Sequence, residues 1–171
     1  MDAMIPTTSA HEAFVAYTRD LQERIVGALA AAEPAPFETR DWTRPQGGGG
    51  RMRLVRGEVI EKGAVLVSDV HGPTNPLTNK PFRAAGLSLI LHPANPHAPT
   101  VHLNVRHFHE EDGGWWGGGM DLTPLGGHHA EDAEHFHATL RKALGEDYDA
   151  GKAEADRYFF VPHRNRTRGA G

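Results

Sequence analysis

The clearest alternation of polar and apolar side chains spans residues 100–106. The apolar side chains at its odd positions are Val101, Leu103 and Val105. The polar side chains at its even positions are Thr100, His102, Asn104 and Arg106. A period of two residues is typical of a strand that packs one face on an apolar core. At about 3.3 Å per residue, the other face should carry an imidazole, an amide and a guanidinium roughly 6 to 7 Å apart.

Two interpretations of this polar face stay open. For any one of these residues, a sheet surface exposed to water is the simpler explanation. The three together, near two tryptophans and several glycines, favour a binding face instead. Other strand-like stretches lie at 52–60 and 64–70, and Leu87, Leu89 and Leu91 alternate with Ser88, Ile90 and His92.

Helical periodicity appears at both ends of the chain. Ser9 and Glu12 have the spacing of a capping box, and they open a predicted helix that reaches about Ala32. Its predicted buried stripe is Phe14, Tyr17, Leu21, Ile25 and Leu29. A second helix is predicted over 130–144 and a third over 148–158. The stripe expected to be buried on the second helix is Ala133, His137, Leu140 and Leu144.

Glycines occur in two runs, at 47–50 and 117–119. The first run is equally consistent with a flexible linker and with a loop that a ligand approaches. The second follows Trp115 and Trp116, which would be costly to expose to water. The run therefore indicates a tight backbone that a flat ligand can approach, with an exposed loop as the alternative.

Composition narrows the class of protein. With 39% hydrophobic and 23% charged residues, the chain resembles a globular protein rather than a disordered one. A formal net charge of −4 argues against general nucleic-acid binding. No apolar run approaches the roughly 20 residues of a membrane helix. The N-terminus lacks the layout of a signal peptide, so a cytoplasmic protein without a membrane span is expected. The sequence has no cysteine, which excludes disulfides and thiolate ligands.

Candidate chemistry centres on anion binding. Arg51, Arg53 and Arg106 could bind carboxylates through bidentate hydrogen bonds, and Asp121 and the histidines could transfer protons near neutral pH. The chain lacks HExxH, a GxSxG elbow around Ser88, GxGxxG and a P-loop. Four histidines could converge on a metal, although their spacing is a weak signal: His92, His102, His137 and His163. These residues alone indicate an enzyme or a binding module for a polycarboxylate.

Several long motifs resemble one family, the oxygen-dependent coproporphyrinogen oxidases. The matching segments, at family spacing from Trp42 onward, are 47–72, 88–108, 115–124, 131–137 and 158–171. The resemblance implies oxidative decarboxylation of two propionates of coproporphyrinogen III to vinyl groups, giving protoporphyrinogen IX. Molecular oxygen would be the co-substrate, and no organic cofactor would be needed.

The resemblance also implies a fold and a set of site residues. The implied fold is α+β, an antiparallel sheet flanked by helices on both faces, working as a homodimer. Ser88, Asn104 and Arg106 would bind substrate, and His102 would be the proton donor. Asp121 would meet the pyrrole N–H groups. A divalent metal has been assigned in the family to the histidines that match His92, His102, His137 and His163.

Family members are much longer than this chain. Residues 1–171 are therefore expected to form one incomplete domain, the N-terminal half of the family fold, without the region that carries the dimer interface. Two other functions stay open. One is a porphyrinogen-binding member without catalysis, and the other is a histidine-rich metal-binding domain.

Overall fold

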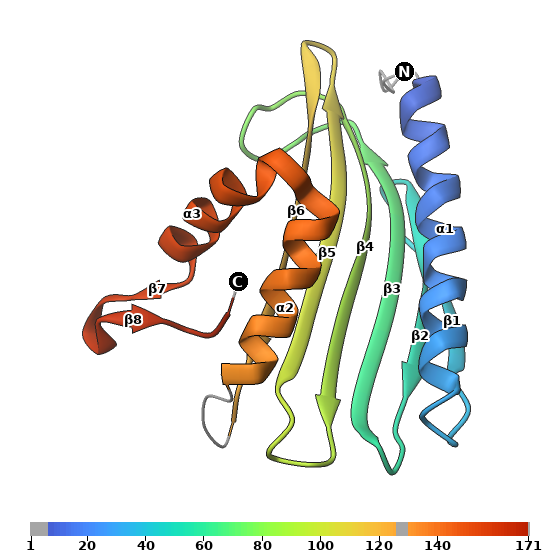
Figure 1. Ribbon diagram of the computed structural model, residues 1–171. Helices are drawn as coiled ribbons and strands as arrows, with labels where there is room; N and C mark the ends of the chain where they lie inside the picture. The colour runs from blue at the N-terminus through green and yellow to red at the C-terminus, as the bar shows by residue number, and fades with distance from the viewer. Residues whose placement is uncertain (1–6, 126–129, 171) are drawn as a thin grey trace.

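The computed structural model describes residues 7–125 and 130–170. Six strands form one antiparallel sheet in which each strand pairs with its neighbours in sequence (Figure 1). They are β1 (Glu38–Thr43), β2 (Gly48–Val55), β3 (Ile60–Gly72), β4 (Phe82–Pro93), β5 (Thr100–Glu110) and β6 (Gly113–Thr123). Helix α1 (Ser9–Ala30) precedes the sheet. The predicted α+β class with an antiparallel sheet is confirmed.

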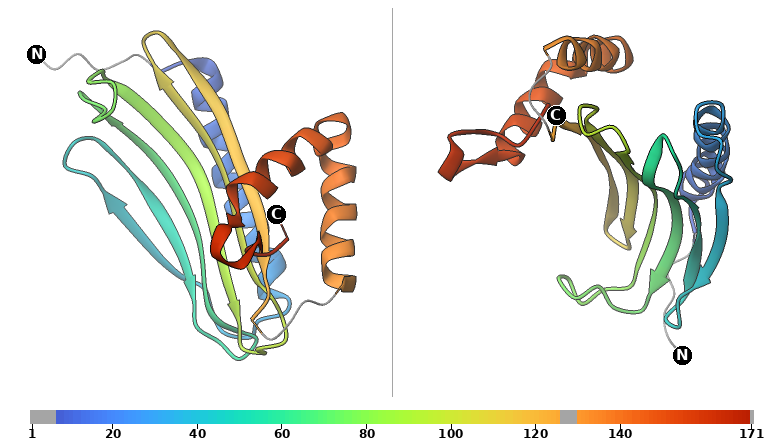
Figure 2. Two further views of the ribbon diagram at one scale, coloured as in Figure 1. Left: turned by 90° about the vertical axis from the view of Figure 1, so that its left-hand side faces the viewer. Right: turned by 90° about the horizontal axis from the view of Figure 1, so that it is seen from below.

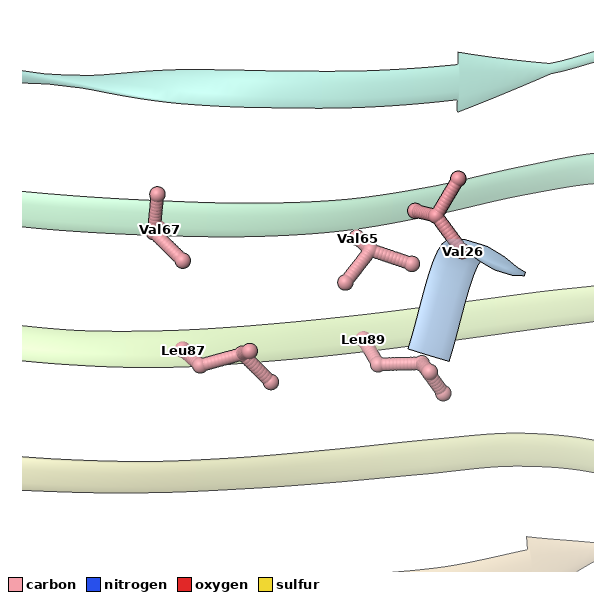
Figure 3. Packing of buried hydrophobic residues seen from close by; sticks show 5 residues of the cluster. All are labelled: Val26, Val65, Val67, Leu87 and Leu89. Atoms are coloured by element: carbon pink, nitrogen blue, oxygen red, sulfur yellow. The ribbon is translucent and has the colours of Figure 1, made fainter. Parts of the chain in front are cut away.

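Helix α1 covers one face of the sheet and builds the core there. Val26 of the helix packs on Val65, Val67, Leu87 and Leu89 of β3 and β4 (Figure 3). The apolar residues of β5 border the same cluster: Val101, Leu103 and Val105. The alternation in β5 therefore predicted its core face correctly. The polar residues between these three apolar residues lie on the opposite face of the sheet.

The predicted stripe of α1 is confirmed in part, because Leu21, Ile25 and Leu29 pack against the core. The most buried positions are nevertheless others, His11, Val15, Thr18, Gln22 and Val26, and Tyr17 of the predicted stripe is 50% exposed. Polar side chains occupy this face because each has a partner. The Gln22 amide donates to the carbonyls of Arg51 (3.0 Å) and Val65 (2.8 Å).

The start and end of α1 are also shifted. Its N-cap is Thr8, whose hydroxyl accepts from the backbone N–H of His11 at 3.1 Å. Ser9, the predicted cap, is instead the first helical residue, and the helix ends at Ala30 rather than Ala32.

Both glycine runs belong largely to strands, which corrects the two loop interpretations. Residues 48–50 open β2, and 117–119 lie within β6. A Cβ at Gly50 would stand 2.2 Å from the carbonyl oxygen of Val67 and 2.8 Å from the Trp42 ring. The absence of a side chain there lets the Trp42 indole pack across the neighbouring strand.

Strands β5 and β6 form a hairpin with a two-residue turn. Glu110 pairs with Gly113, so the turn consists of Glu111 and Asp112, and Gly113 has a φ of 132°. Because neighbouring residues of a strand point to opposite faces, the two tryptophans of β6 separate. Trp116 stacks on His107 on the α1 face, with ring centroids 4.0 Å apart, whereas Trp115 stacks on Phe108 on the other face.

The last part of the chain lies beyond the β6 edge of the sheet (Figure 2). It comprises α2 (Ala130–Leu144), η1 (Gly145–Asp147), α3 (Tyr148–Tyr158), β7 (Phe160–Val161), η2 (Pro162–Arg164) and β8 (Arg166–Thr167). Phe136 is the buried residue of α2, whereas Leu144 of its predicted stripe is exposed. Ala170 pairs with Leu122 and ties this part to β6.

Two expectations about the whole chain stay predictions. Helices on both faces of the sheet would require cover opposite α1. In the part of the chain that the structure describes, α2 and α3 contact each other and η1 rather than spreading over that face. The assignment of residues 1–171 to one incomplete domain likewise stays a prediction. No helix among the residues described is long and apolar enough to cross a membrane.

Candidate functional site

The sheet face opposite α1 brings five predicted site residues together on three adjacent strands. Cross-strand pairing sets Ser88 of β4 beside Asn104 of β5, and His102 of β5 beside Asp121 of β6. Arg106 lies two residues beyond Asn104 on the same face of β5. Since two residues of a strand advance about 6.6 Å, these side chains form three successive rows across the sheet.

A histidine–aspartate pair forms the first row. His102 Nδ1 lies 3.0 Å from Asp121 Oδ1, and the Asp121 side chain is almost fully buried. With its proton on Nδ1, His102 donates to the carboxylate, which fixes the plane of the imidazole. Nε2 is then the ring atom that is available to contact a ligand.

Two further groups hold the Asp121 carboxylate. Thr123 Oγ1 donates to Oδ1 at 2.9 Å, and Arg168 Nη2 donates to Oδ2 at 3.2 Å. Both carboxylate oxygens are therefore hydrogen-bonded, as expected for a buried charged group. Sequence patterns did not identify Thr123 or Arg168, because both belong to the site only through the folded position of Asp121.

The Arg106 guanidinium is exposed and hydrogen-bonds to a neutral partner. Its Nε and Nη2 donate to Asn104 Oδ1 at 3.2 and 2.7 Å. Among the residues described, no carboxylate forms an ion pair with Arg106. An exposed guanidinium oriented by an amide retains donors for an incoming carboxylate.

The other two candidate arginines lie on the α1 face, which corrects their proposed role. Arg51 is paired with Val67 in the sheet, and its Nε donates to Asp41 Oδ1 at 2.8 Å. That hydrogen bond raises the pKa of Arg51. Arg53 forms an ion pair with Glu23 of α1. Both arginines are thus engaged on the face away from the site.

Glycines flank the polar rows, so no side chains project from the sheet at these neighbouring positions. Arg106 lies between Gly86 of β4 and Gly117 of β6, and Asn104 lies beside Gly119. At Gly119 a Cβ would find no heavy atom within 4 Å. Backbone is therefore exposed beside the Asn104 amide, which suits a flat ligand with acidic substituents.

The four histidines predicted as metal ligands are not brought together. His92 lies in β4 opposite Lys62, His137 in α2 and His163 in η2. His137 Nδ1 instead lies 3.1 Å from the Tyr148 hydroxyl, and burial lowers its pKa. Within residues 7–125 and 130–170, no three His, Asp or Glu side chains are grouped so as to hold a metal ion. The metal set stays a prediction.

A second polar cluster lies under the first turns of α1, on the opposite face of the sheet. His11 Nε2 is 3.0 Å from Asp69 Oδ1, and its Nδ1 is 3.2 Å from His107 Nδ1. Burial is the main cause that lowers the pKa of His107, and the neighbouring His11 and His109 add to it. Sequence patterns did not identify this cluster, because its members come from α1, β3 and β5.

One family model matches this chain. Its description is coproporphyrinogen III oxidase, and the match spans residues 13–171. That range contains all five residues of the sheet-face site, together with Thr123 and Arg168.

Proposed function

Because the chain belongs to the coproporphyrinogen III oxidase family, we propose that it catalyses the oxygen-dependent conversion of coproporphyrinogen III to protoporphyrinogen IX. Membership of the family implies a coproporphyrinogen oxidase-type role in porphyrin biosynthesis and a porphyrinogen substrate. The observation that carries the proposal is the His102–Asp121 pair on the same glycine-rich sheet face as Asn104 and Arg106.

Substrate binding uses the rows of Asn104 and Arg106. The substrate is a flexible ring of four pyrroles with four carboxylates. It needs a sheet surface without bulky side chains and cationic hydrogen-bond donors. Arg106 binds one carboxylate through its guanidinium, with Asn104 holding that group in place. Ser88, beside Asn104, contributes a hydroxyl. The flanking glycines allow the pyrroles to approach the backbone.

Proton transfer uses the first row. Each decarboxylation releases one CO₂ and removes one hydrogen from the neighbouring carbon, leaving a vinyl group. Molecular oxygen accepts the two electrons with two protons and leaves as hydrogen peroxide, which balances the reaction. His102 acts as the proton donor at Nε2, and Asp121 stabilises the imidazolium through Nδ1. Asp121 is also positioned to accept from pyrrole N–H groups.

Oxygen as the electron acceptor is supported by the segments that resemble the oxygen-dependent enzymes, among them 88–108 and 115–124. The reaction as proposed needs no organic cofactor. A homodimeric state and a cytoplasmic location stay predictions.

The test begins with coproporphyrinogen III prepared without oxygen. The purified protein is incubated with it with and without air, and the tricarboxylate and dicarboxylate products are separated by chromatography. The proposal is supported if the protein forms product only when air is present and releases a matching amount of hydrogen peroxide. Porphyrinogen binding without any product would instead favour the non-catalytic binding protein.

Two variants assign the residues. Arg106→Ala should raise KM roughly 10- to 150-fold, since a hydrogen bond to a charged group contributes about 1.5 to 3 kcal/mol. His102→Ala should lower kcat more than it raises KM. Arg51→Ala is the matched control, because that arginine is also exposed but lies on the other face of the sheet. Equal effects of Arg51→Ala and Arg106→Ala would contradict the assignment.

A further inference from the structure

An aromatic ladder continues the candidate site beyond the row of Arg106. It consists of Phe82 of β4, Phe108 of β5 and Trp115 of β6, all on the face opposite α1. The ring centroids of Phe82 and Phe108 are 5.9 Å apart, and those of Phe108 and Trp115 are 5.7 Å apart, with both pairs stacked. The Arg44 guanidinium lies 5.7 Å from the Phe82 centroid at the inner end.

The outer end of the ladder is open. Trp115 is 48% exposed, so much of its indole meets water on the face that carries the three polar rows. Exposed aromatic surface beside an anion-binding group indicates a surface that a ligand covers.

Trp115 and Arg106 border the same glycine. A Cβ at Gly117 would stand 2.9 Å from an atom of the Trp115 ring and 3.9 Å from Arg106 Cγ. The indole therefore lies over Gly117, and Gly117 pairs with Arg106 across the strands. Diagonal neighbours of this kind are about 7 to 8 Å apart at Cα, within the reach of aromatic and long side chains. The indole and the Arg106 side chain thus border one glycine on one face.

We propose that Trp115 is a substrate-binding residue that stacks on one pyrrole ring while Arg106 binds the carboxylate carried by that same ring. The inference rests on the proposed function and adds to it a specific contact. A pyrrole that bears a two-carbon carboxylate arm is flat and apolar at one end and anionic at the other. The indole and the Arg106 side chain on either side of Gly117 match both ends, with the guanidinium held at Asn104. The ladder behind Trp115 restrains its ring by stacking, so that the indole is held in place before substrate binds.

A purely structural ladder is the competing explanation, because cross-strand aromatic pairs also stabilise sheets. The chain itself offers a matched control. Trp116 is the next residue of the same strand but stacks on His107 on the α1 face. The same substitution at the two positions removes the same side chain from opposite faces of β6.

The experiment compares Trp115→Leu, Trp115→Phe and Trp116→Leu with the wild type. Binding is measured with coproporphyrin III, the oxidised analogue that does not turn over, through quenching of tryptophan fluorescence and the absorbance change of the porphyrin. Steady-state kinetics with coproporphyrinogen III give KM and kcat separately. Urea unfolding of each variant confirms that it is folded under assay conditions.

Trp115→Leu is expected to weaken coproporphyrin binding and raise KM about tenfold, while kcat changes much less. Trp115→Phe, which keeps an aromatic face, should recover most of the affinity, and Trp116→Leu should bind as the wild type does. Unchanged binding by folded Trp115→Leu would overturn the inference. So would equal losses for Trp115→Leu and Trp116→Leu that follow a loss of stability.

The inference and the proposed function fail in different ways. Turnover that is indifferent to Trp115 would refute the contact and leave the oxidase intact. Trp115-dependent porphyrin binding without product would support the contact and refute the oxidase. A wild-type chain that binds no porphyrin would overturn both.

Discussion

Gly119 offers a substitution that separates stability from function. It lies in β6 beside Asn104, on the face proposed to bind the macrocycle, and nothing lies within 4 Å of the point where its Cβ would stand. Its φ is not in the left-handed region that favours glycine. Gly119→Ala therefore adds one methyl group to the candidate site without disturbing a neighbouring atom of the protein.

The two expected effects have opposite signs. Alanine restricts the unfolded chain, so folding stability should rise by about 0.4 to 1 kcal/mol. In the complex the methyl group would stand where a pyrrole approaches the backbone. Overpacking a close contact by one methyl group typically costs about 1 to 3 kcal/mol. That range corresponds to a loss of affinity of roughly 5- to 150-fold.

The assay pairs urea unfolding with steady-state kinetics on coproporphyrinogen III. Gly27→Ala in α1 is the control for stability, because Gly27 also has open space around it and lies on the helix. It should raise stability and leave KM unchanged. Gly118→Ala is the control for strain, because its Cβ would stand 2.6 Å from the carbonyl oxygen of Asn104. It should lower stability.

One result would refute this reasoning. If Gly119→Ala is at least as stable as the wild type and keeps its KM, then no substrate atom approaches the backbone beside Asn104. The sheet surface without bulky side chains around the polar rows would then have no role in binding, and the macrocycle would have to bind elsewhere.

Three further predictions concern stability. Leu87→Ala should lower the free energy of unfolding by about 2 to 5 kcal/mol in urea, since Leu87 is fully buried in the core. As the pH falls below 6.5, the unfolded chain should take up a proton before buried His107 does, because burial lowers the folded pKa. Stability should therefore fall over that window, and His107→Phe should flatten this slope; an unchanged slope would contradict the assignment. Glu33→Gln should lower the urea midpoint, because the carboxylate accepts from the backbone N–H groups of Ile60 and Ala35, which lower its pKa. The contribution of Glu33 should be present above pH 4.5 and lost as the pH falls through its lowered pKa.

The alternation of polar and apolar side chains predicted the sheet correctly where apolar residues mark the face that packs on the core. In β5, Val101, Leu103 and Val105 face the core as predicted, so His102 and Arg106 share the other face. That alternation is local and needs no knowledge of the rest of the chain.

Helix α1 shows why its buried side was less predictable. Thr18 and Gln22 are buried although they are polar, because hydrogen bonds to backbone carbonyls satisfy them. A stripe chosen by large apolar residues falls one position away from a face chosen by such partners. The helix itself was predicted, but its rotation depended on contacts with β2 and β3.

The structure of the two glycine runs was not predicted, for a related reason. Glycine is unfavourable in strands by propensity, and it has no side chain whose polarity could show an alternation, so nothing in the runs 48–50 and 117–119 predicts a strand. In the structure, neighbours such as Trp42 and Trp115 occupy the space that a side chain would need. Tertiary packing outweighed local preference at both places.

The pairing of His102 with Asp121 required the register of the β5–β6 hairpin. Asp112–Gly113 is a typical hairpin dipeptide, but a two-residue turn made of it would pair His102 with Thr123. The observed turn is Glu111 and Asp112, one residue earlier, and this register pairs His102 with Asp121. The sequence therefore contained a signal for the hairpin but not for its register. No comparable signal existed for Arg168, which reaches Asp121 from 47 residues away.

The turn of Glu111 and Asp112 also governs how the gene can vary in length at this point. Side chains alternate along β6, so one codon inserted or deleted between 110 and 113 would exchange the faces of every residue downstream. With the two-residue turn kept, a deletion would bring Trp116 to the place of Trp115 and an insertion would bring Gly114 there. In both cases Asp121 would turn away from His102. A bulge could absorb the extra residue, but it would distort the strand that carries Arg106 or the one that carries Gly117. Selection on activity should therefore reject single-codon length changes in this hairpin and accept changes of two codons far more readily.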